Sequence, residues 1–529
     1  MPLSPPANPS PGGSTAVSFV VAGICFGLTA TVPAAPADGA PLADARFVDA
    51  SSLPAVGTVD ARFQSYNIEM IEITGGKFWK PYRSKQDGGP APEPHSGSDT
   101  PPGMDSSLYQ YRPPIDLTRA RLRKLAAALG PSYLRVSGTW ANTTYFADSD
   151  TPPATPPAGF GGVLTRPQWR GVVDFAKAAD AAIVTSFAIG PGTRDASGVW
   201  KPDQAQALLA YTGEVGGRIA AAEFMNEPDL AAMGGAPDGY DAAAYGRDFK
   251  IFRSWMRQAA PGVKILGPGT VGETSIASDL LAALGPGLDA VSYHYYGALS
   301  ARCGGQRTAE AALSPAWLSQ TDRTLQFYVT LRDRFAPGKP IWLTETAEAA
   351  CGGNPWAATF LDTFRYLDQL GRLAKAGVQV VMHNTLAASD YGLLDETTLR
   401  PRPNYWGAWL WRQWMGTTVL DAGVPVRSDL HVYAHCQRGV PGGVILLVIN
   451  PDRKAPHALR LARPSLRYTL EAANLGDTEV RLNGRVLALG DGDALPALEG
   501  VPAEANKVSF APASISFLAV PAAANHACR

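Results

Sequence analysis

The stretch Ile219-Ala-Ala-Ala-Glu-Phe-Met225, followed by Asn226-Glu-Pro-Asp229, is the segment on which the predicted fold of this chain depends. A short, largely apolar run of this kind is typical of a buried strand, and Pro228 ends it because proline has no backbone donor for the ladder. Helix-like segments flank the run, at residues 203–213 and 240–259. A strand with a helix on each side is the unit of an α/β fold.

The same unit recurs along residues 62–416. We predict strands at Phe63–Ile73, Tyr133–Ser137, Ala182–Ala188, Ile219–Met225, Lys264–Leu266, Ala290–Tyr296, Pro340–Thr344 and Val378–His383. We predict helices at Asp116–Leu129, Thr165–Ala179, Asp203–Gly213, Tyr240–Ala259, Ser275–Leu284, Ser314–Phe335, Asn354–Lys375 and Asn404–Met415. Eight strands alternating with eight helices predict an α/β fold of the (β/α)8 TIM barrel type.

A long insertion rich in Pro, Gly and Ser follows the first strand, at Gly75–Pro114. Loops after the strands of such a barrel form its C-terminal face, where substrates bind. The insertion is therefore expected at the binding face. Its Trp79 and Tyr82, together with Trp140, are either sugar-stacking residues or ordinary core aromatics.

The pattern changes in residues 417–529. Helical periodicity ends there, and short β-rich runs alternate with turn signals such as Asn483-Gly484. We predict an all-β sandwich for this part of the chain. Residues 38–61 form an N-terminal segment that is expected to add a strand to the sandwich.

The N-terminus is typical of a secretory signal peptide over residues 1–37. An apolar run at Ala16–Ala30 leads to a small-residue segment with the pattern Ala35-Pro36-Ala37. The first basic residue is Arg46, so the run lacks the usual positive start. The alternative is a disordered tail with an apolar patch. The signal peptide predicts a secreted or periplasmic protein.

Composition narrows the class of partner. The chain has 529 residues, and its 46 Lys+Arg against 47 Asp+Glu give a net charge of -1. That balance provides no electrostatic case for binding nucleic acid. Beyond the N-terminus no apolar run approaches the roughly 18 residues of a membrane span, so no membrane partner is expected.

Two carboxylates end predicted barrel strands. Glu227 follows the fourth strand and Glu345 ends the seventh, in Ile341-Trp-Leu-Thr-Glu-Thr346. Hydrolysis of a glycosidic bond needs two such carboxyl groups on either side of it, one protonated and one ionised. The amide of Asn226 can hold a substrate hydroxyl beside the acid. A single Glu would be read as a surface or salt-bridged carboxylate, but the pair predicts a glycosidase.

These residues carry a resemblance to glycoside hydrolase family 79, the heparanase-type retaining β-glucuronidases, and in particular to its bacterial heparanase-like members. The similar motifs are Leu134-Arg-Val-Ser-Gly-Thr139, Phe224-Met-Asn-Glu-Pro228, Tyr293-His-Tyr-Tyr296, Trp342-Leu-Thr-Glu-Thr346 and Ser514-Ile-Ser-Phe-Leu518. The resemblance implies Glu227 as acid/base and Glu345 as nucleophile. It also implies sugar contacts from Glu69, Thr139, Asn226 and Tyr296, although heparanase has an Asp where this chain has Glu69.

The resemblance further implies that Gly352, Gly353 and Tyr391 hold the carboxylate of the glucuronic acid. Consecutive glycines allow backbone N–H groups to approach an anion. His294 ends the sixth strand, where a histidine can orient the nucleophilic carboxylate by hydrogen bonding. The alternatives are that the glycines belong to an ordinary flexible loop and that His294 belongs to a core aromatic cluster.

The sequence leaves two alternatives for how a polymeric substrate would be bound. The basic residues Lys77, Lys80, Arg83, Lys85, Arg302 and Arg307 either line the cleft for a sulfated chain or are solvated surface charges. The resemblance of the insertion to that of the bacterial members favours internal cleavage of a heparan sulfate-like glycosaminoglycan.

Cysteine usage agrees with an oxidising compartment. Outside the signal region four cysteines remain, an even number, as two disulfides require. The resemblance implies a bridge between Cys436 and Cys528. Cys303 and Cys351 follow strands six and seven, on loops of the same face, and we expect them to form the second bridge.

The sequence also contains motifs typical of other functions. Gly267-Pro-Gly-Thr-Val-Gly272 fits a dinucleotide motif, but Pro268 and the position of Asp289 suit a barrel loop better. No H-E-x-x-H occurs, so no metal and no cofactor are expected. The remaining rivals are an exo-β-glucuronidase, a clan arabinofuranosidase or xylosidase, and an inactive glycan-binding protein.

Overall fold

The computed structural model describes residues 45–82, 101, 104–425 and 429–529. The predicted signal peptide lies outside the described residues, as do Arg83, Lys85 and much of the insertion. None of the helices in the described ranges is long and apolar enough to cross a membrane.

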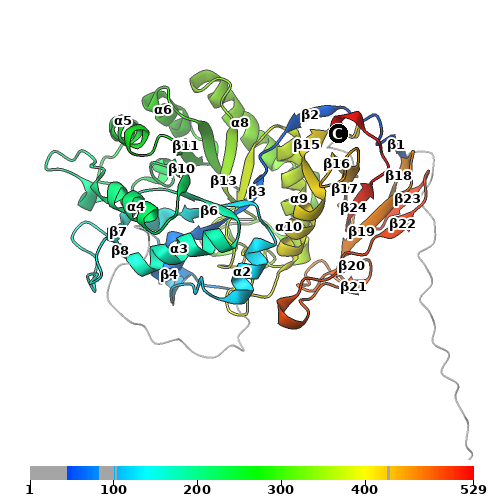
Figure 1. Cartoon of the computed structure of the whole chain (residues 1–529), viewed down its shortest axis with the longest axis horizontal. Helices are drawn as coiled ribbons and strands as arrows, with labels where there is room; N and C mark the ends of the chain where they lie inside the picture. The colour runs from blue at the N-terminus through cyan, green and yellow to red at the C-terminus, as the bar shows by residue number, and fades with distance from the viewer. Residues whose placement is uncertain (1–44, 83–100, 102–103, 426–428) are drawn as a thin grey trace, which may run out of the picture. The chain divides into compact units, whose positions relative to one another are not determined.

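The N-terminal part is a closed barrel of eight strands, each hydrogen-bonded in parallel to its neighbours (Figure 1). In barrel order the strands are β3 (Gln64–Glu69), β6 (Ser132–Ser137), β9 (Ala181–Thr185), β10 (Ile219–Glu223), β11 (Lys264–Val271), β12 (Ala290–Tyr296), β13 (Ile341–Ala347) and β14 (Val380–His383). Pairing of β14 with β3 closes the ring. The predicted (β/α)8 barrel is confirmed.

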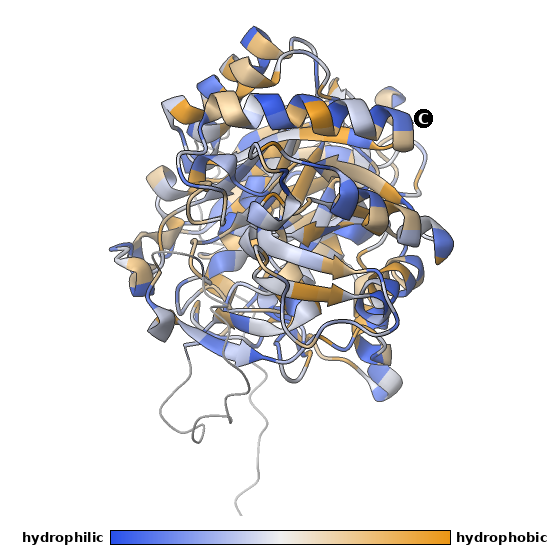
Figure 2. Ribbon diagram, turned by 90° about the vertical axis from the view of Figure 1, so that its left-hand side faces the viewer, coloured by the Kyte–Doolittle hydropathy of each residue, from blue (hydrophilic) through white to orange (hydrophobic). Residues whose placement is uncertain are grey.

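The helices around the barrel are amphipathic, as their sequence period requires. They are α2 (Ala120–Ala127), α3 (Arg166–Ala178), α4 (Asp203–Glu214), α5 (Ala242–Ala259), α6 (Ser275–Leu284), α8 (Gln320–Phe335), α9 (Phe360–Lys375) and α10 (Pro403–Trp414). Figure 2 shows hydrophilic and hydrophobic residues alternating along helices at the surface of the molecule. Most of these helices turn their apolar residues towards the strands, which are buried on both faces, whereas α9 is buried throughout Phe360–Ala374.

Several predicted boundaries are wrong. The first strand was expected to reach Ile73 but ends at Glu69, and α1 (Met70–Thr74) follows it. The Glu69 N–H donates to the Glu72 carboxylate at 2.7 Å and so closes the first turn of that helix. An apolar run this short does not by its periodicity distinguish a buried strand from a buried helix. The helix predicted from Ser314 is likewise divided, into α7 (Pro315–Leu318) and α8.

Two pairs of short strands lie in the segments that follow barrel strands β3 and β6. β4 (Gly76–Trp79) and β5 (Tyr109–Arg112) pair antiparallel at the two ends of the insertion. β7 (Thr144–Ala147) and β8 (Gly162–Thr165) pair in parallel before α3. Thr165 then caps α3 in a reciprocal pair of contacts with Gln168.

The C-terminal part is built of two sheets. The larger contains β2 (Ala55–Thr58), β15 (Met415–Leu420), β16 (His431–Gln437), β17 (Val444–Asn450), β19 (Ser465–Glu471), β20 (Arg481–Leu482), β21 (Arg485–Val486), β22 (Val501–Ala503) and β24 (Ser514–Val520). The smaller contains β1 (Arg46–Val48), β18 (His457–Leu461) and β23 (Val508–Phe510). The predicted all-β sandwich is confirmed.

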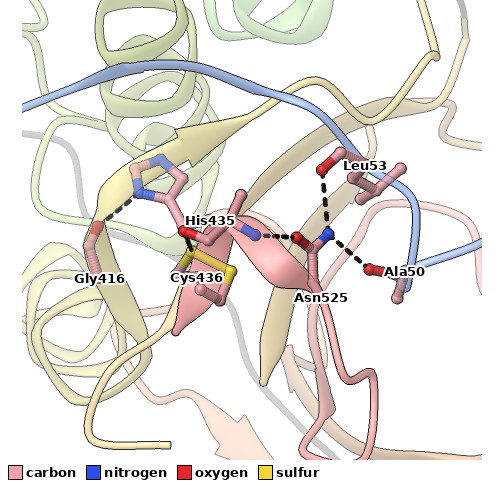
Figure 3. Close-up of a disulfide and its surroundings, with 8 residues drawn as sticks. Ala50, Leu53, Gly416, His435, Cys436 and Asn525 are labelled. Carbon is pink, nitrogen blue, oxygen red and sulfur yellow. Dashed lines mark hydrogen bonds between the residues drawn. A yellow bond between two sulfur atoms is a disulfide. The ribbon is translucent and has the colours of Figure 1, made fainter. Parts of the chain in front are cut away.

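The N-terminal segment contributes a strand to each sheet, where one strand in all was predicted. β2 pairs antiparallel with β15, and β1 pairs in parallel with β18. Asn525 holds the chain between them, because its side-chain amide donates to the carbonyls of Ala50 at 2.9 Å and Leu53 at 3.0 Å (Figure 3). The Cys436–Cys528 disulfide lies next to this contact, as predicted.

Barrel and sandwich share a buried polar contact. Asp368 of α9 is fully buried and accepts from Tyr433 of β16 at 2.5 Å. It also contacts His431 Nδ1 at 2.6 Å and pairs with Arg372 at 2.6 Å. α9 is therefore the barrel helix that makes this buried polar contact with the sandwich.

Candidate active site

The two predicted carboxylates meet at the C-terminal end of the barrel. Glu345 lies on β13, and Glu227 follows the end of β10. His294 of β12 is directly in register with Glu345. One oxygen of each glutamate and one His294 ring nitrogen all lie within 4.8 Å of one another. The two glutamates are 8% and 5% exposed, so both are buried.

Glu345 is held by donors on both of its oxygens. Arg135 Nη1 donates to Oε2 at 2.7 Å, and the Tyr296 hydroxyl donates to Oε1 at 2.5 Å. Burial by itself would raise the pKa of Glu345, but the charges of His294 and Arg135 and these hydrogen bonds outweigh it and lower the pKa. Glu345 is thereby kept ionised, as a nucleophile must be.

Arg135, which the sequence reasoning did not assign a role, organises this site. Its guanidinium is 1% exposed, and besides Glu345 it donates to Glu223 at 2.9 Å and to Asn226 Oδ1 at 2.8 Å. A signal was available, because an arginine inside the apolar strand β6 must find acidic partners in the interior. Glu223, also missed, is the second carboxylate that balances it.

His294 lies nearer to Glu227 than to Glu345. Its Nδ1 is 3.0 Å from Glu227 Oε1 and 3.8 Å from Glu345 Oε2, whereas the expectation was that it orients the nucleophile. Its Nε2 is 3.2 Å from Arg135 Nη2. The contact of Nδ1 with Glu227 Oε1 is a hydrogen bond between the ring and the carboxyl group. His294 therefore orients the carboxyl group of Glu227.

Asn226 is fixed from behind. Asn142 accepts from the Asn226 N–H at 2.8 Å and donates to the Asn226 carbonyl at 2.9 Å. Since Asn226 Oδ1 accepts from Arg135, the side-chain NH2 is the group left for a ligand. Asn142 carries no sequence signal of its own, because its role depends on a loop folding back from β6.

Gly138, which directly precedes Thr139, lies against the side chain of Glu69. A β-carbon on Gly138, whose φ is +93°, would fall 1.5 Å from Glu69 Oε2. Glu69 is buried, and burial, followed by the charge of Glu345, raises its pKa well above the ordinary value. Within the described part of the chain, Glu69 Oε2 has no hydrogen-bond partner. A neutral carboxyl with a free oxygen can bind a sugar hydroxyl.

The glycine segment after β13 presents unpaired backbone donors. Cys351, Gly352 and Gly353 have φ values of 61°, 79° and 84°, the left-handed region. Both glycines are buried, and among the described residues neither of their N–H groups has a hydrogen-bond partner. Buried N–H groups are seldom left unpaired, so this segment is suited to an anionic ligand.

Tyr391 completes this corner and connects it to Glu345. A β-carbon on Gly353 would lie 3.3 Å from the Tyr391 ring. Asn384 Nδ2 is 3.4 Å from the Tyr391 hydroxyl and 3.0 Å from the Tyr296 hydroxyl, which in turn donates to Glu345. Tyr296 therefore contacts the carboxylate directly, in addition to its predicted place near the sugar.

Arg302 is neither a cleft cation nor a solvated charge. Its side chain is 8% exposed, pairs with Asp390 at 2.9 Å and stacks on Tyr82 at 3.8 Å. Trp79 packs against Gly352, and its ring stacks on Tyr109 at 4.6 Å. These residues form a wall beside the glycine segment.

Glu227, His294 and Glu345 are close enough in space to be considered as metal ligands. Arg135, however, already contacts Glu345 and His294, so its positive charge meets any cation placed between them. The arrangement suits acid–base and nucleophilic chemistry better than it suits a metal.

Comparisons with known proteins find similar glycoside hydrolases. Residues 114–371 match the family model of the glycosyl hydrolase family 79 N-terminal domain, a span that contains both glutamates. Heparanase of Mus musculus is 29% identical over 476 residues, covering 77% of this chain and 87% of the mouse protein. Heparanase-like protein 1 of Arabidopsis thaliana is 29% identical over 64% of this chain, and the match spans 65% of the plant protein.

A further relative is baicalin-β-D-glucuronidase of Scutellaria baicalensis, 31% identical over 34% of this chain and 36% of its own length. Among solved structures, a 4-O-α-L-rhamnosyl-β-D-glucuronidase of Fusarium oxysporum superposes with a TM-score of 0.61 at 14% identity, over 90% of this chain and all of that one. An α-L-arabinofuranosidase of Thermotoga maritima gives a TM-score of 0.61 at 14% identity, over 90% and 99%. These two structures share the fold.

Proposed function

Because the chain belongs to glycosyl hydrolase family 79, we propose that this glycoside hydrolase is a retaining β-D-glucuronidase with Glu345 as nucleophile and Glu227 as acid/base. The observation that carries the proposal is the approach of the two carboxyl groups to within 4.8 Å. Retaining glycosidases hold them about 5–5.5 Å apart, whereas inverting enzymes leave room for a water.

In the first half-reaction Glu345 attacks the anomeric carbon and Glu227 protonates the leaving oxygen, which gives a covalent glycosyl-enzyme. In the second half-reaction Glu227 deprotonates a water that displaces Glu345. The low pKa of Glu345 supports its role as the ionised partner. The contact with His294 holds the acid/base in place.

Two variants test these roles. Glu345→Gln removes the nucleophile, so turnover should be lost on every substrate. Glu227→Ala should spare the first step on an aryl β-glucuronide with a good leaving group, and azide should restore turnover by forming β-glucuronyl azide. Rapid turnover by Glu345→Gln, or a first product of α configuration, would contradict the assignment.

For specificity we propose that the carboxylate of glucuronic acid binds the N–H groups of Gly352 and Gly353 and the Tyr391 hydroxyl. The unpaired donors of that corner support this. Charge-assisted hydrogen bonds are worth about 1.5–3 kcal/mol each, and a glucoside cannot use them. Release from an aryl β-glucuronide but not from matched glucosides, arabinofuranosides or xylosides separates this function from the clan rivals. Release from none of them would favour a glycan-binding protein.

For the natural substrate we propose internal glucuronic acid linkages of heparan sulfate-like chains, supported by the heparanases among the relatives. One observation favours the alternative, an exo-β-glucuronidase, because Arg302 is engaged in the wall and not free for sulfate. A heparan sulfate digest decides between them. Internal cleavage lowers chain length early, whereas release of monosaccharide without early shortening identifies the exo enzyme.

We also infer export to the cell exterior or the periplasm. The two disulfides, Cys303–Cys351 and Cys436–Cys528, support it, because such bonds persist in oxidising compartments. Fractionation of cells that express the full chain tests this inference. Recovery of intact, uncleaved protein from the cytoplasm would contradict it.

A further inference from the structure

A buried carboxylate outside the reacting pair lies beneath the glycine segment. Glu348 follows β13, three residues after Glu345, and is fully buried. It touches neither Glu227 nor Glu345 in any hydrogen bond of the described chain. Neither its sequence position nor the proposed mechanism gives it a role.

Both oxygens of Glu348 are engaged by one residue. The Asn354 backbone N–H donates to Oε2 at 2.9 Å, and Asn354 Nδ2 donates to Oε1 at 2.8 Å. This is the pattern of a carboxylate that only accepts. Since Asn354 directly follows Gly353, the contact fixes the plane of the Gly353–Asn354 peptide and with it the end of the glycine segment.

The same segment is tied to the loop after β12 at three further points. Asn354 Oδ1 accepts from the Ala301 N–H at 2.9 Å, and Ser300 Oγ donates to the Cys351 carbonyl at 3.1 Å. The disulfide joins Cys303 to Cys351. Glu348 is the one acidic side chain among these attachments.

A rigid segment is what this region requires. Cys351 adopts φ 61°, a conformation that a residue with a β-carbon holds only when its surroundings impose it. Donors aimed at an anion also bind it strongly only if they do not have to be reorganised on binding. The attachments of Asn354 and Cys351 supply both constraints.

We propose that Glu348 is a specificity-determining positioning residue, which sets the glycine segment through Asn354 so that its N–H groups recognise a substrate carboxylate. This rests on the proposed β-glucuronidase function. In the described chain Glu348 makes no hydrogen bond to Glu227 or Glu345, and it acts through the backbone it holds.

The test is Glu348→Gln, which keeps the shape but replaces one acceptor by an NH2 that faces an Asn354 donor. We expect kcat/KM on an aryl β-glucuronide to fall about tenfold or more, mainly through KM, because each lost charge-assisted bond corresponds to about a factor of ten. Residual turnover of the matched aryl β-glucoside should change less than about twofold.

A swap provides the rescue. In the double variant Glu348→Gln/Asn354→Asp the amide and the carboxylate exchange places, so both hydrogen bonds can form again and selectivity should recover. Asp248→Asn is the matched control, because Asp248 is also fully buried and ion-paired, with Arg194 at 2.7 Å, but lies outside the site. Its selectivity should equal that of the unmodified enzyme.

The outcomes separate the two proposals. If the unmodified enzyme does not hydrolyse the glucuronide, the proposed function fails. If it does, but Glu348→Gln loses glucuronide and glucoside turnover equally, or loses neither, the role of Glu348 is overturned. Should Glu348→Gln not fold, Asn354→Ala removes the side-chain donor to Glu348 Oε1, keeps the backbone donor to Oε2, and must show the same selective loss.

Discussion

At the scale of single residues, the site is a set of charges that balance one another. Arg135 stands between Glu223 and Glu345, with His294 and Asn226 against its outer nitrogen. The pKa of Glu345 is lowered, while that of the neighbouring Glu69 is raised. One buried pocket thus holds an ionised carboxylate beside a neutral one, because only the first has the arginine and tyrosine donors.

Tyr296→Phe should show what the hydroxyl contact with Glu345 contributes. Its hydrogen bond helps to lower the pKa of Glu345, so its loss raises that pKa. A nucleophile must be ionised, and the acidic limb of the kcat/KM profile should therefore move to higher pH, with kcat falling about tenfold or more. Tyr295→Phe, on the opposite face of β12, is the control. An unmoved acidic limb in Tyr296→Phe would refute this reading.

Gly138→Ala tests the contact between the β6 loop and Glu69. The new β-carbon would fall 1.5 Å from Glu69 Oε2, so we expect both activity and stability to be lost. Gly198→Ala is a matched control, since its φ of +79° is similar but nothing lies within 4 Å of its β-carbon. Backbone strain alone should cost it about 1 kcal/mol. Equal unfolding free energies for the two variants would mean that the clash is relieved at no cost.

At the scale of elements, the site is assembled from the strands β3, β6, β10, β12, β13 and β14 and from the loops that follow them. The strands bring these loops together because their C-terminal ends share one face of the barrel. The two disulfides connect different parts of the molecule. Cys303–Cys351 joins the loops after β12 and β13, and Cys436–Cys528 joins β16 to the chain end.

Removing each bridge should therefore have different functional effects. Chain entropy predicts a loss of roughly 4–5 kcal/mol for either, because they close 48 and 92 residues. Only the double variant Cys303→Ser/Cys351→Ser should also reduce the preference for glucuronide over glucoside. Denaturant titration and paired kinetics measure both effects. Selectivity lost equally in Cys436→Ser/Cys528→Ser would show that the loss is a general consequence of instability.

At the scale of the whole molecule, the barrel and the sandwich are joined through α9. Figure 1 shows α9 beside the strands of the sandwich, and Asp368 is where the contact is buried. Three groups converge on this carboxylate, from both parts of the molecule. Burial would raise the pKa of Asp368, but its partners lower it. The contact is therefore ionic and costly to break from one side.

Asp368→Asn should lower the unfolding free energy by about 3 kcal/mol or more, because the buried Arg372 loses its buried charge partner and keeps the partly exposed Asp322 at 2.6 Å. Asp421→Asn breaks another barrel–sandwich pair, with Lys375 at 2.8 Å, but one that is partly exposed. Its cost should stay below about 1 kcal/mol. Thermal or denaturant unfolding compares the two. Equal losses would argue that Asp368 is not the main polar attachment.

Much of this architecture could be predicted from the sequence, for an identifiable reason. Apolar runs and helical periods report whether a residue is buried, which is a local property, so the eight barrel strands and the positions of Glu227 and Glu345 at strand ends were recovered. Arg135 could also have been noticed, since a charge in an apolar strand needs a partner. The periodicity of the sequence does not identify that partner.

The remaining features exist only in the tertiary structure. The approach of His294 to Glu227, the bonds of Asn142 to Asn226 and the chain from Tyr391 through Asn384 to Tyr296 join residues from different loops. Arg302 was equally readable as a surface charge until Asp390 and Tyr82 were found against it. Such contacts depend on how the loops after separate strands fold over one face, and that is set by packing between distant segments and not by any local pattern.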